Sequence, residues 1–192
     1  MSDVLRKEDW FVASIPHKEA AEFIREHHYS KGCSLTSVYR HGLFKKEDPS
    51  RLMGVAIWLP PTKPAAESVN KEHWKKVLSL TRMAVVPECP RNSCSFLLSR
   101  SIKAIKAEGR FVSLVTYADE RVGHDGLVYK AANWKYIGKM KGSPAWIDPK
   151  TNRQVAIKST VSRTYEQMRS LGYVNVGTFG KHKFVYHLES EK

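Results

Sequence analysis

The chain has 192 residues, of which 42% are hydrophobic and 10% aromatic, and it carries a formal net charge of +13. This length suits one ordinary domain, the apolar content excludes a disordered chain, and the absence of an apolar run of about 20 residues excludes a membrane-spanning helix. The positive charge predicts a polyanionic partner, with a merely basic, soluble protein as the alternative.

The cysteines and the first residues indicate a cellular compartment. Three cysteines without a CxxC pair argue against a disulfide framework and against a structural zinc site. The first residues are charged and contain no apolar stretch long enough for a signal peptide. We therefore expect an intracellular protein with reduced thiols.

The first part of the chain predicts a strand, a helix and a hairpin. Alternation and β-branched content favour strands, and apolar spacing on one face favours a helix. Prolines make residues 60–64 unsuited to regular helix or central strand. The predicted elements are a strand over 10–15, a helix beginning at 16 and running to 26, strands over about 36–44 and 52–59, and a turn over 45–50.

The middle of the chain predicts a strand, helix and strand unit. A strand over 77–86 is stopped by Pro87 and Pro90, and a helix over 93–107 has its apolar residues on one face. Gly109 closes this helix before a buried strand over 111–117 begins. Such a unit predicts one parallel crossover.

The last part completes a mixed sheet. We expect a helix over 126–133, a strand over 134–140, a helix over 162–171 and a terminal strand over 182–188. The predicted fold class is α/β (α+β), with a mixed, mainly antiparallel central sheet flanked by helices on both faces. A single domain over 1–192 is expected, with 141–181 as a basic insertion or extension before the last strand. This element order is that of an acyltransferase fold.

Two motifs carry a resemblance to a known family. TRMAVVPECPRNSCSFLLSRSIKAI, followed by VTYADERVGHDGLVYKAANWKYIG, resembles the Mom-type DNA-modification proteins of bacteriophages, which belong to the GNAT acyltransferase superfamily. The early HHYS is also similar, so the resemblance covers residues 22–138, and the basic tail matches only loosely. It implies a GNAT-like enzyme that converts the exocyclic amine of adenine in DNA to a carbamoylmethyl derivative, which protects phage DNA from restriction enzymes. It also implies the cytoplasm of a phage-infected or prophage-carrying bacterium.

His28, Tyr29 and Asp119 are the predicted catalytic residues. His28 has an ordinary pKa suited to proton transfer, Tyr29 can donate a hydrogen bond or stack on a base, and both match the Mom-like HHYS. Asp119 follows a predicted buried strand, and it is our candidate for the base that takes a proton from the amine. Helix capping is the alternative for Asp119. A metal site formed by His28, Asp119 and His124 is a further alternative.

The loop before the helix over 93–107 holds the predicted cofactor site. GNAT proteins bind the pyrophosphate of coenzyme A at a glycine-rich loop and a helix N-terminus. In this chain the loop has no glycine, so acetyl-CoA is implied by the resemblance alone. A helix cap explains Asn92 or Ser93 equally well, and a buried ion pair is the alternative for Arg82. The predicted cofactor-binding residues are Arg82, Arg91, Asn92, Ser93 and Ser95.

The late basic segment is the predicted nucleic-acid interface. Residues 141–183 contain eight Lys and Arg against Asp148 and Glu166, with aromatic residues between them that can stack on bases or pack a core. Tyr117 can hold a flipped base. The predicted nucleic-acid-binding residues are Tyr117, His124, Lys141, Lys150, Arg153, Lys158 and Arg163.

Two further functions stay open beside the Mom-like enzyme. One is a GNAT acyltransferase that acts on a small-molecule or protein amine, and the other is a nucleic-acid-binding module without catalysis. The leading hypothesis predicts double-stranded DNA as the partner, no membrane and no assigned metal. It leaves the oligomeric state open, with a homodimer as one option.

Overall fold

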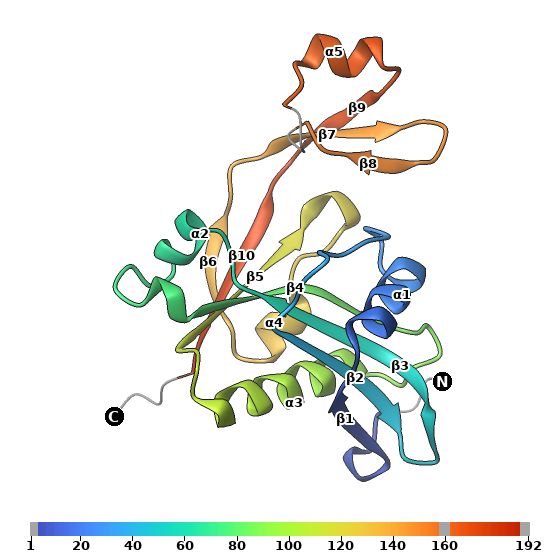
Figure 1. Cartoon of the computed structure of the whole chain (residues 1–192), viewed down its shortest axis with the longest axis vertical. Helices are drawn as coiled ribbons and strands as arrows, with labels where there is room; N and C mark the ends of the chain where they lie inside the picture. Colours follow the sequence, from blue (N-terminus) through green and yellow to red (C-terminus); the bar gives the residue numbers. More distant parts are fainter. Residues whose placement is uncertain (1–3, 158–161, 189–192) are drawn as a thin grey trace.

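The computed structural model describes residues 4–157 and 162–188, which form two β-sheets and their covering helices (Figure 1). The seven-stranded sheet has the order β1-β2-β3-β4-β5-β10-β6, and the three-stranded sheet has the order β8-β7-β9. In the described residues no helix is long and apolar enough to cross a membrane. The elements are β1 Trp10–Ser14, α1 His17–His27, β2 Tyr39–Lys45, β3 Asp48–Leu59, α2 Lys63–Glu67, β4 Val77–Val85, α3 Ser93–Glu108, β5 Ser113–Asp119, α4 Leu127–Ala131, β6 Lys135–Lys139, β7 Ser143–Asp148, β8 Arg153–Val155, α5 Tyr165–Ser170, β9 Val174–Phe179 and β10 Lys181–His187, with 3-10 turns over Lys7–Asp9, Trp74–Lys76 and Glu120–Val122.

The large sheet is mainly antiparallel, as predicted. Its one parallel pair is β4 with β5, and α3 connects these two strands. Gly109 ends α3 in the left-handed conformation, with φ of 67°, which a residue without a Cβ adopts at little cost. The predicted parallel crossover is therefore confirmed.

Helices cover both faces of this sheet. Lys183 and Phe184 are neighbours in β10, so their side chains point to opposite faces. The Lys183 Nζ donates to Ser68 Oγ at the end of α2 (2.7 Å), whereas the Phe184 ring lies 5.4 Å from the ring of Tyr129 in α4. The flanking helices confirm the predicted layer arrangement.

The main hydrophobic core lies between this sheet and its helices. Ile24 of α1, Leu97 of α3 and Trp58, Leu114 and Phe184 of the sheet are all buried and belong to one cluster. Burying side chains of this size contributes about 1.5–3 kcal/mol each, so this cluster dominates the stability of the sheet and its helices. We call the seven-stranded sheet with α1–α4 the body.

Two local predictions were wrong. The predicted turn over 45–50 is shorter, because Lys45 pairs with Asp48 and β3 begins there. A short helix, α2, begins at Lys63, within the segment predicted to be irregular. Pro64 lies in the first turn of α2, where the missing N–H of proline removes no hydrogen bond.

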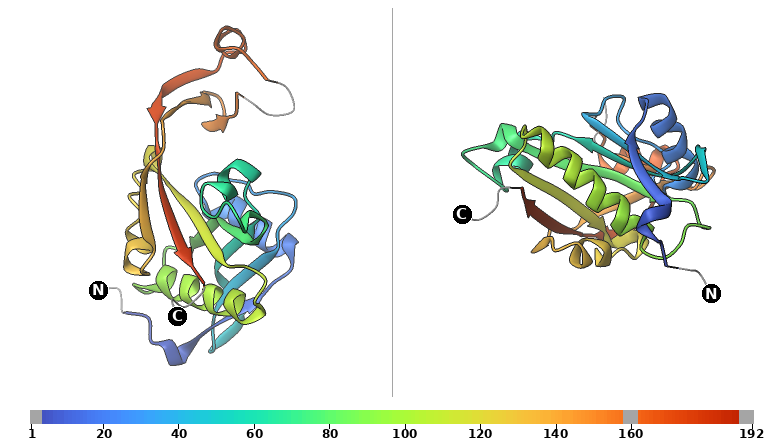
Figure 2. Two further views of the ribbon diagram at one scale, coloured as in Figure 1. Left: turned by 90° about the vertical axis from the view of Figure 1, so that its left-hand side faces the viewer. Right: turned by 90° about the horizontal axis from the view of Figure 1, so that it is seen from below.

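The segment between β6 and β10 contains three strands that the sequence did not predict. β7, β8 and β9 form the small sheet, and α5 packs on it, with the rings of Trp146 and Tyr165 5.8 Å apart. Trp146 and Met168 are fully buried beneath this contact. We call residues 142–157 and 162–180 the arm, which projects from the body (Figure 1, Figure 2).

Candidate functional site

The candidate site lies where two neighbouring strands of the body separate. The parallel pairing of β4 with β5 ends at Leu80 and Thr116. Beyond that point β4 continues beside β3, and β5 continues beside β10 as far as the Asp119–Lys181 pair. The divergence opens the sheet at the carboxyl end of β5.

A cavity of about 290 Å³ fills this opening. Five parts of the chain contribute to it: the end of α1, the bend of β4, the first turn of α3, the end of β5 and the loop that enters α4. Residues far apart in the sequence are thus brought together at one point. The lining residues are His28, Tyr29, Leu80, Thr81, Arg82, Met83, Cys94, Thr116, Tyr117, Ala118, Gly123, His124, Asp125, Gly126, Leu127, Val128 and Tyr129.

His28 is a neutral, hydrogen-bonding group in this cavity. Burial, reinforced by the charge of Arg82, lowers the pKa of His28 to about 4, well below the value near neutrality that the sequence alone suggests. The backbone N–H of Ser30 donates to Nδ1 (3.1 Å), and the Ser30 hydroxyl lies 2.9 Å from the same nitrogen. Acceptance of the backbone bond places the proton of the neutral ring on Nε2. His28 therefore offers a donor to a ligand rather than a base.

Tyr29 lies between the two histidines of the cavity. Its ring centroid is 4.3 Å from that of His28 and 5.5 Å from that of His124, the latter in an edge-on arrangement. Burial and then the charge of Asp119 raise the pKa of Tyr29 to about 12. Tyr29 is therefore a neutral phenol at physiological pH and can donate a hydrogen bond.

Arg82 ties the loop after α1 to β4. Its Nε donates to the carbonyl of Gly32 (2.7 Å), and its Nη1 donates to the carbonyl of Thr81 (2.6 Å). Among the described residues no carboxylate forms an ion pair with it, so the alternative of a buried ion pair is wrong. Arg82 holds the chain that follows His28 and Tyr29 against the cavity while contributing a positive charge to it.

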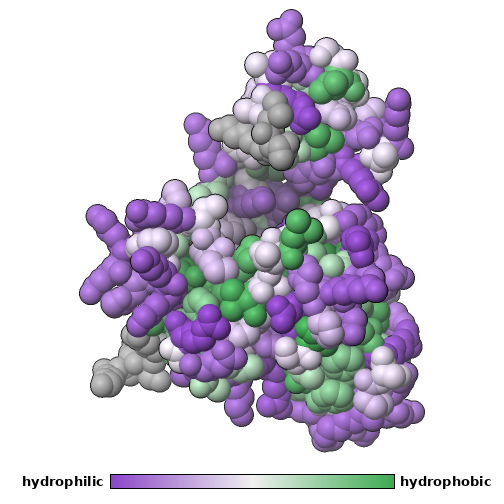
Figure 3. Space-filling view, viewed as in Figure 1, coloured by the Kyte–Doolittle hydropathy of each residue, from purple (hydrophilic) through white to green (hydrophobic). Residues whose placement is uncertain are grey.

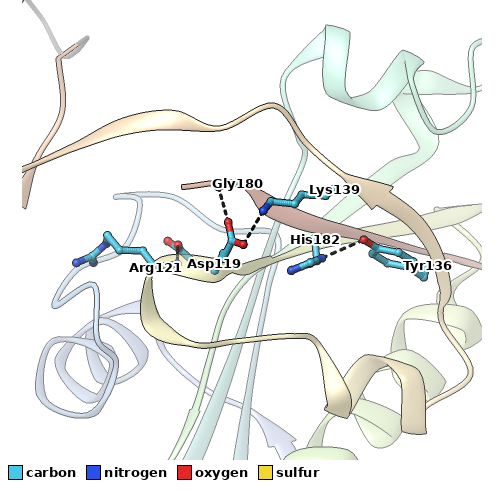
Figure 4. A network of polar contacts seen from close by, with 7 residues as sticks. Asp119, Arg121, Tyr136, Lys139, Gly180 and His182 are labelled. Carbon is cyan, nitrogen blue, oxygen red and sulfur yellow. Dashed lines mark hydrogen bonds and ion pairs between the residues drawn. The ribbon is translucent and has the colours of Figure 1, made fainter. Parts of the chain in front are cut away.

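Asp119 is the last residue of β5 and is largely buried, with 8% of its surface exposed. Its Oδ1 accepts the backbone N–H of Arg121 (3.0 Å), so it caps the following 3-10 turn (Figure 4). Its backbone carbonyl accepts the N–H of His124 (3.2 Å), which turns the chain back toward Tyr29. The described residues that line the cavity do not include Asp119. The capping alternative is thus observed for one carboxylate oxygen, and the catalytic role stays a prediction.

The residue after Asp119 fastens this end of β5 to the base of the arm. Glu120 Oε1 pairs with Lys139 Nζ (2.6 Å), and Glu120 Oε2 accepts the N–H of Gly180 (3.0 Å). Nearby, the hydroxyl of Tyr136 and His182 Nδ1 lie 3.0 Å apart. The contacts of Glu120 thus join the strand that leaves the body to the strand that returns to it.

The start of α3 lies between the cavity and a second, larger groove. Asn92 and Ser95 line the groove of about 880 Å³ along α3, which also carries the cations Arg100 and Lys103. Cys94, in the same first turn, lines the cavity instead. The first turn of α3 therefore contributes side chains both to the basic groove and to the cavity.

Two predicted cofactor residues form hydrogen bonds within the protein, Ser93 in a local turn and Arg91 with the start of the chain. The Ser93 Oγ donates to the carbonyl of Pro90 (2.7 Å), and the carbonyl of Arg91 accepts the N–H of Leu5 (3.0 Å). Asn92 takes the left-handed conformation that a glycine would otherwise favour, with φ of 70°. The lack of glycine in this loop is thus accommodated by one asparagine.

The predicted nucleic-acid residues fall into two groups. Tyr117 and His124 line the cavity, whereas the remaining described members belong to the segment between β6 and β10. Lys158 lies outside the described residues. The members in that segment are Lys141, Lys150, Arg153 and Arg163, of which all but the half-buried Arg163 are exposed.

Sequence reasoning missed five polar residues of the cavity: Thr81, Cys94, Thr116, Asp125 and Tyr129. The one available signal was the Gly123-His124-Asp125-Gly126 turn, which fixes the approach to α4. A Cβ at Gly126 would lie 2.3 Å from the Phe184 ring, so only glycine fits there. The described residues contain no group of three His, Cys, Asp or Glu placed to hold a metal, so His28, Asp119 and His124 do not form one.

Comparisons with known proteins agree on one family. The sequence model of the Mom protein family matches residues 9–192. The methylcarbamoylase mom of Escherichia phage Mu is 32% identical over 123 residues, which are 62% of this chain and 49% of that protein. The chain therefore spans about half the length of the curated relative it matches.

Solved acetyltransferases share the fold. An N-acetyltransferase from Staphylococcus aureus Mu50 has a TM-score of 0.55 at 11% identity, over 94% of this chain and 99% of that chain. The ribosomal-protein-S18-alanine N-acetyltransferase from Escherichia coli has a TM-score of 0.56 at 10% identity, over 95% and 96%. The yncA protein of Salmonella typhimurium, solved with its cofactor acetyl-CoA, has a TM-score of 0.56 at 8% identity, over 95% and 96%. At these identities the likeness establishes the acetyltransferase fold, which was predicted.

Proposed function

The chain belongs to the Mom protein family, and we propose that it is a transferase that modifies the exocyclic amine of adenine in DNA with a carbamoylmethyl group, protecting the DNA from restriction enzymes. The observation that carries this proposal is the cavity at the separation of β4 and β5, where His28, Tyr29 and Tyr117 meet. Its volume of about 290 Å³ suits a base rather than a duplex. The adenine would be flipped out of the helix to enter it.

The neutral groups of the cavity suit a weakly nucleophilic base. His28 Nε2–H and the Tyr29 hydroxyl are donors that can bind the ring nitrogens of adenine, and Tyr117 offers an aromatic surface. Because the histidine is kept neutral by burial, it does not repel Arg82 or attract solvent anions at physiological pH. These residues would orient and desolvate the amine.

Asp119 is our candidate for the group that takes the proton released when the amine forms its new bond to carbon. It lies at the end of β5 next to the cavity-lining Ala118, and its negative charge contributes to the raised pKa of Tyr29. One carboxylate oxygen is engaged by Arg121, which leaves the other as an acceptor. Tyr29 would connect the amine to this acceptor.

Acetyl-CoA is the cofactor that the fold implies, and the residues present fit it. The first turn of α3 presents backbone N–H groups to an anion, and Arg100 and Lys103 line the adjoining groove. The cavity of about 290 Å³ then leads from this turn toward Tyr29. When bound, acetyl-CoA would supply an acetyl group that the thioester activates at its carbonyl carbon. A carbamoylmethyl product joins the adenine nitrogen to the neighbouring carbon and contains an amide nitrogen, so its formation needs a nitrogen donor in addition to acetyl-CoA. The chain's own residues would bind the phosphates of the cofactor and orient the acceptor amine.

The test is nucleoside mass spectrometry of DNA from bacteria that express the chain. We expect carbamoylmethyl-adenine with the wild type and its loss with His28→Ala. His73→Ala is the matched control, because the side chain of His73 is exposed outside the cavity. Unmodified adenine with soluble, folded wild-type protein would overturn the proposal. Acylation of a small-molecule or protein amine in the same cells would then favour an ordinary acyltransferase.

A further inference from the structure

The arm is a small folded unit with one covered face. α5 packs on the side of the β8-β7-β9 sheet that is turned away from the body (Figure 1, Figure 2). The aromatic contact of Trp146 with Tyr165 and the burial of Met168 hold α5 in place. In the space-filling view the arm rises from the body across a hollowed waist (Figure 3). The β7–β8 hairpin is therefore part of a sheet that α5 stabilises by packing on one face.

The arm is rooted beside the candidate site. β10 begins opposite the end of β5, where Lys181 pairs with Asp119, so the returning strand of the arm enters the body at the same edge. Glu120 binds both Lys139 and Gly180 at this root. The β7–β8 hairpin extends over the part of the body where α1 lies (Figure 1). A long ligand that reaches the cavity from this edge would pass the hairpin.

The tip of the β7–β8 hairpin, residues 148–153, is a closed turn that displays cations. Asp148 accepts the backbone N–H of Lys150 (2.9 Å) and the hydroxyl of Thr151 (3.0 Å), and its carbonyl accepts the N–H of Asn152 (2.8 Å). The one carboxylate of the tip is thus occupied by the turn itself. Lys150 and Arg153 are exposed, and neither forms an ion pair with another described residue.

We propose that this hairpin tip is a clamp for the phosphate backbone of double-stranded DNA, with Lys150 and Arg153 binding phosphates beside the adenine held in the cavity. This inference rests on the proposed function. A flipped base costs a few kcal/mol of stacking and pairing, so the flanking duplex must be held by contacts of its own. A fixed turn with two exposed cations on a supported sheet supplies such contacts, and phosphates bind cations without regard to sequence.

The charges of the chain favour this partner over an acidic protein surface. The net charge of +13 creates an attractive potential for a polyanion, and most of the arm's charged side chains are basic. DNA presents about one negative charge per 1.7 Å of helix axis, so two cations on one turn can each reach a phosphate. The clamp therefore acts on the substrate that the cavity requires, rather than on a separate partner.

The experiment compares salt dependence of DNA binding in matched variants. The slope of the logarithm of affinity against the logarithm of salt concentration is about −0.9 for each phosphate contact, so Lys150→Gln with Arg153→Gln should reduce its magnitude by about 1.8. These substitutions keep the turn, because Asp148 binds the backbone rather than the side chain of Lys150. The control is Lys71→Gln with Lys76→Gln, which removes the same charge from exposed positions near α2.

The outcomes distinguish failure of the proposed clamp from failure of the proposed enzymatic function. A reduced slope in the arm variant and an unchanged slope in the control support the clamp, and carbamoylmethyl-adenine in cells should fall with the affinity. An unchanged slope in the arm variant overturns the clamp and leaves the proposed function standing. Wild-type protein that binds no duplex DNA even at low salt overturns both. An equal fall in both variants also overturns the clamp, because the effect then follows from net charge alone.

Discussion

The cavity of the body and the tip of the arm use polar side chains in opposite ways. In the cavity, burial lowers the pKa of His28 to about 4, and burial with the charge of Asp119 raises the pKa of the partly exposed Tyr29 to about 12, so both side chains are neutral at physiological pH. At the tip, Lys150 and Arg153 stand in solvent, where salt screens their charges. Chemistry that needs a fixed hydrogen-bonding pattern belongs in the first environment, and rapid, reversible attraction of a polyanion belongs in the second.

The largest expected effect on activity comes from substitution of Asp119, because this residue caps a turn and is also the proposed general base. Removal of a general base costs about 10²–10⁴-fold in rate, so Asp119→Asn should lower adenine modification by that factor. Asparagine keeps an oxygen that can accept the Arg121 N–H, and the turn should survive. Asp119→Ala removes both roles and should also lower the melting temperature.

The two substitutions at Asp119 therefore separate capping from catalysis. Activity is measured by nucleoside mass spectrometry and stability by thermal unfolding. Wild-type levels of modification in Asp119→Asn, with a melting temperature below wild type in Asp119→Ala, would show that the residue only caps the turn.

Trp58 in the body and Trp146 in the arm are both fully buried, and each indole N–H lacks a hydrogen-bond partner in the described structure. Trp58→Ala should lower the free energy of unfolding by about 3–5 kcal/mol, because it opens a cavity in the main core. Trp146→Ala should release α5 and the small sheet while the amides of α3 and β5 stay protected from hydrogen exchange. Equal loss of protection in body and arm would show that they unfold as one unit.

Local patterns explain why the body was predicted better than the arm. Strand β5 is buried along nearly its whole length, helix α3 is apolar on one face, and the two are separated by a clear stop signal at Gly109. β8 has three residues with no buried member, and β9 contains Asn175 and Gly177, which are uncommon in strands. Strands β8 and β9 are stabilised by pairing with β7 and by packing around Trp146. Contacts between residues distant in the sequence leave little signal in the local sequence pattern.

The same reasoning applies to the site. His28 and Tyr29 were predicted because they form a compact motif beside a helix end. Cys94, Thr116 and Tyr129 come from three separate elements, and only the divergence of β4 from β5 brings them together. The depressed pKa of His28 likewise depends on burial by distant residues, so an ordinary value was the natural expectation from sequence.

Two buried histidines should make the body sensitive to acid. Burial lowers the pKa of His41, like that of His28, from 6.5 to about 4. The unfolded chain then takes up protons first, so stability is fully present above pH 6.5 and falls as the pH drops toward 4. Each histidine contributes about 3 kcal/mol to this loss. His41→Leu should therefore reduce the loss of unfolding free energy between pH 7 and pH 4 by about that amount.

The control for His41 is His73→Leu, which removes an exposed histidine outside the core. Chemical denaturation at a series of pH values measures both. His41 is distinct from the cavity-lining His28, so adenine modification at pH 7 should be retained in His41→Leu. A profile identical to wild type would mean that His41 keeps an ordinary pKa in the folded protein.

The smallest expected effect is at Glu120, which connects the two regions. Its ion pair with Lys139 is exposed and its hydrogen bond from Gly180 is part-buried, so Glu120→Ala should lower the melting temperature only slightly. It should, however, accelerate hydrogen exchange at the Gly180 amide, because the carboxylate that accepts this N–H is lost. Glu120→Gln keeps an acceptor for Gly180 but loses the ion pair with Lys139. If Glu120→Gln restores slow exchange at the Gly180 amide, the hydrogen bond to Gly180 holds the base of the arm in place. If Glu120→Gln exchanges as fast as Glu120→Ala, the ion pair with Lys139 holds it in place.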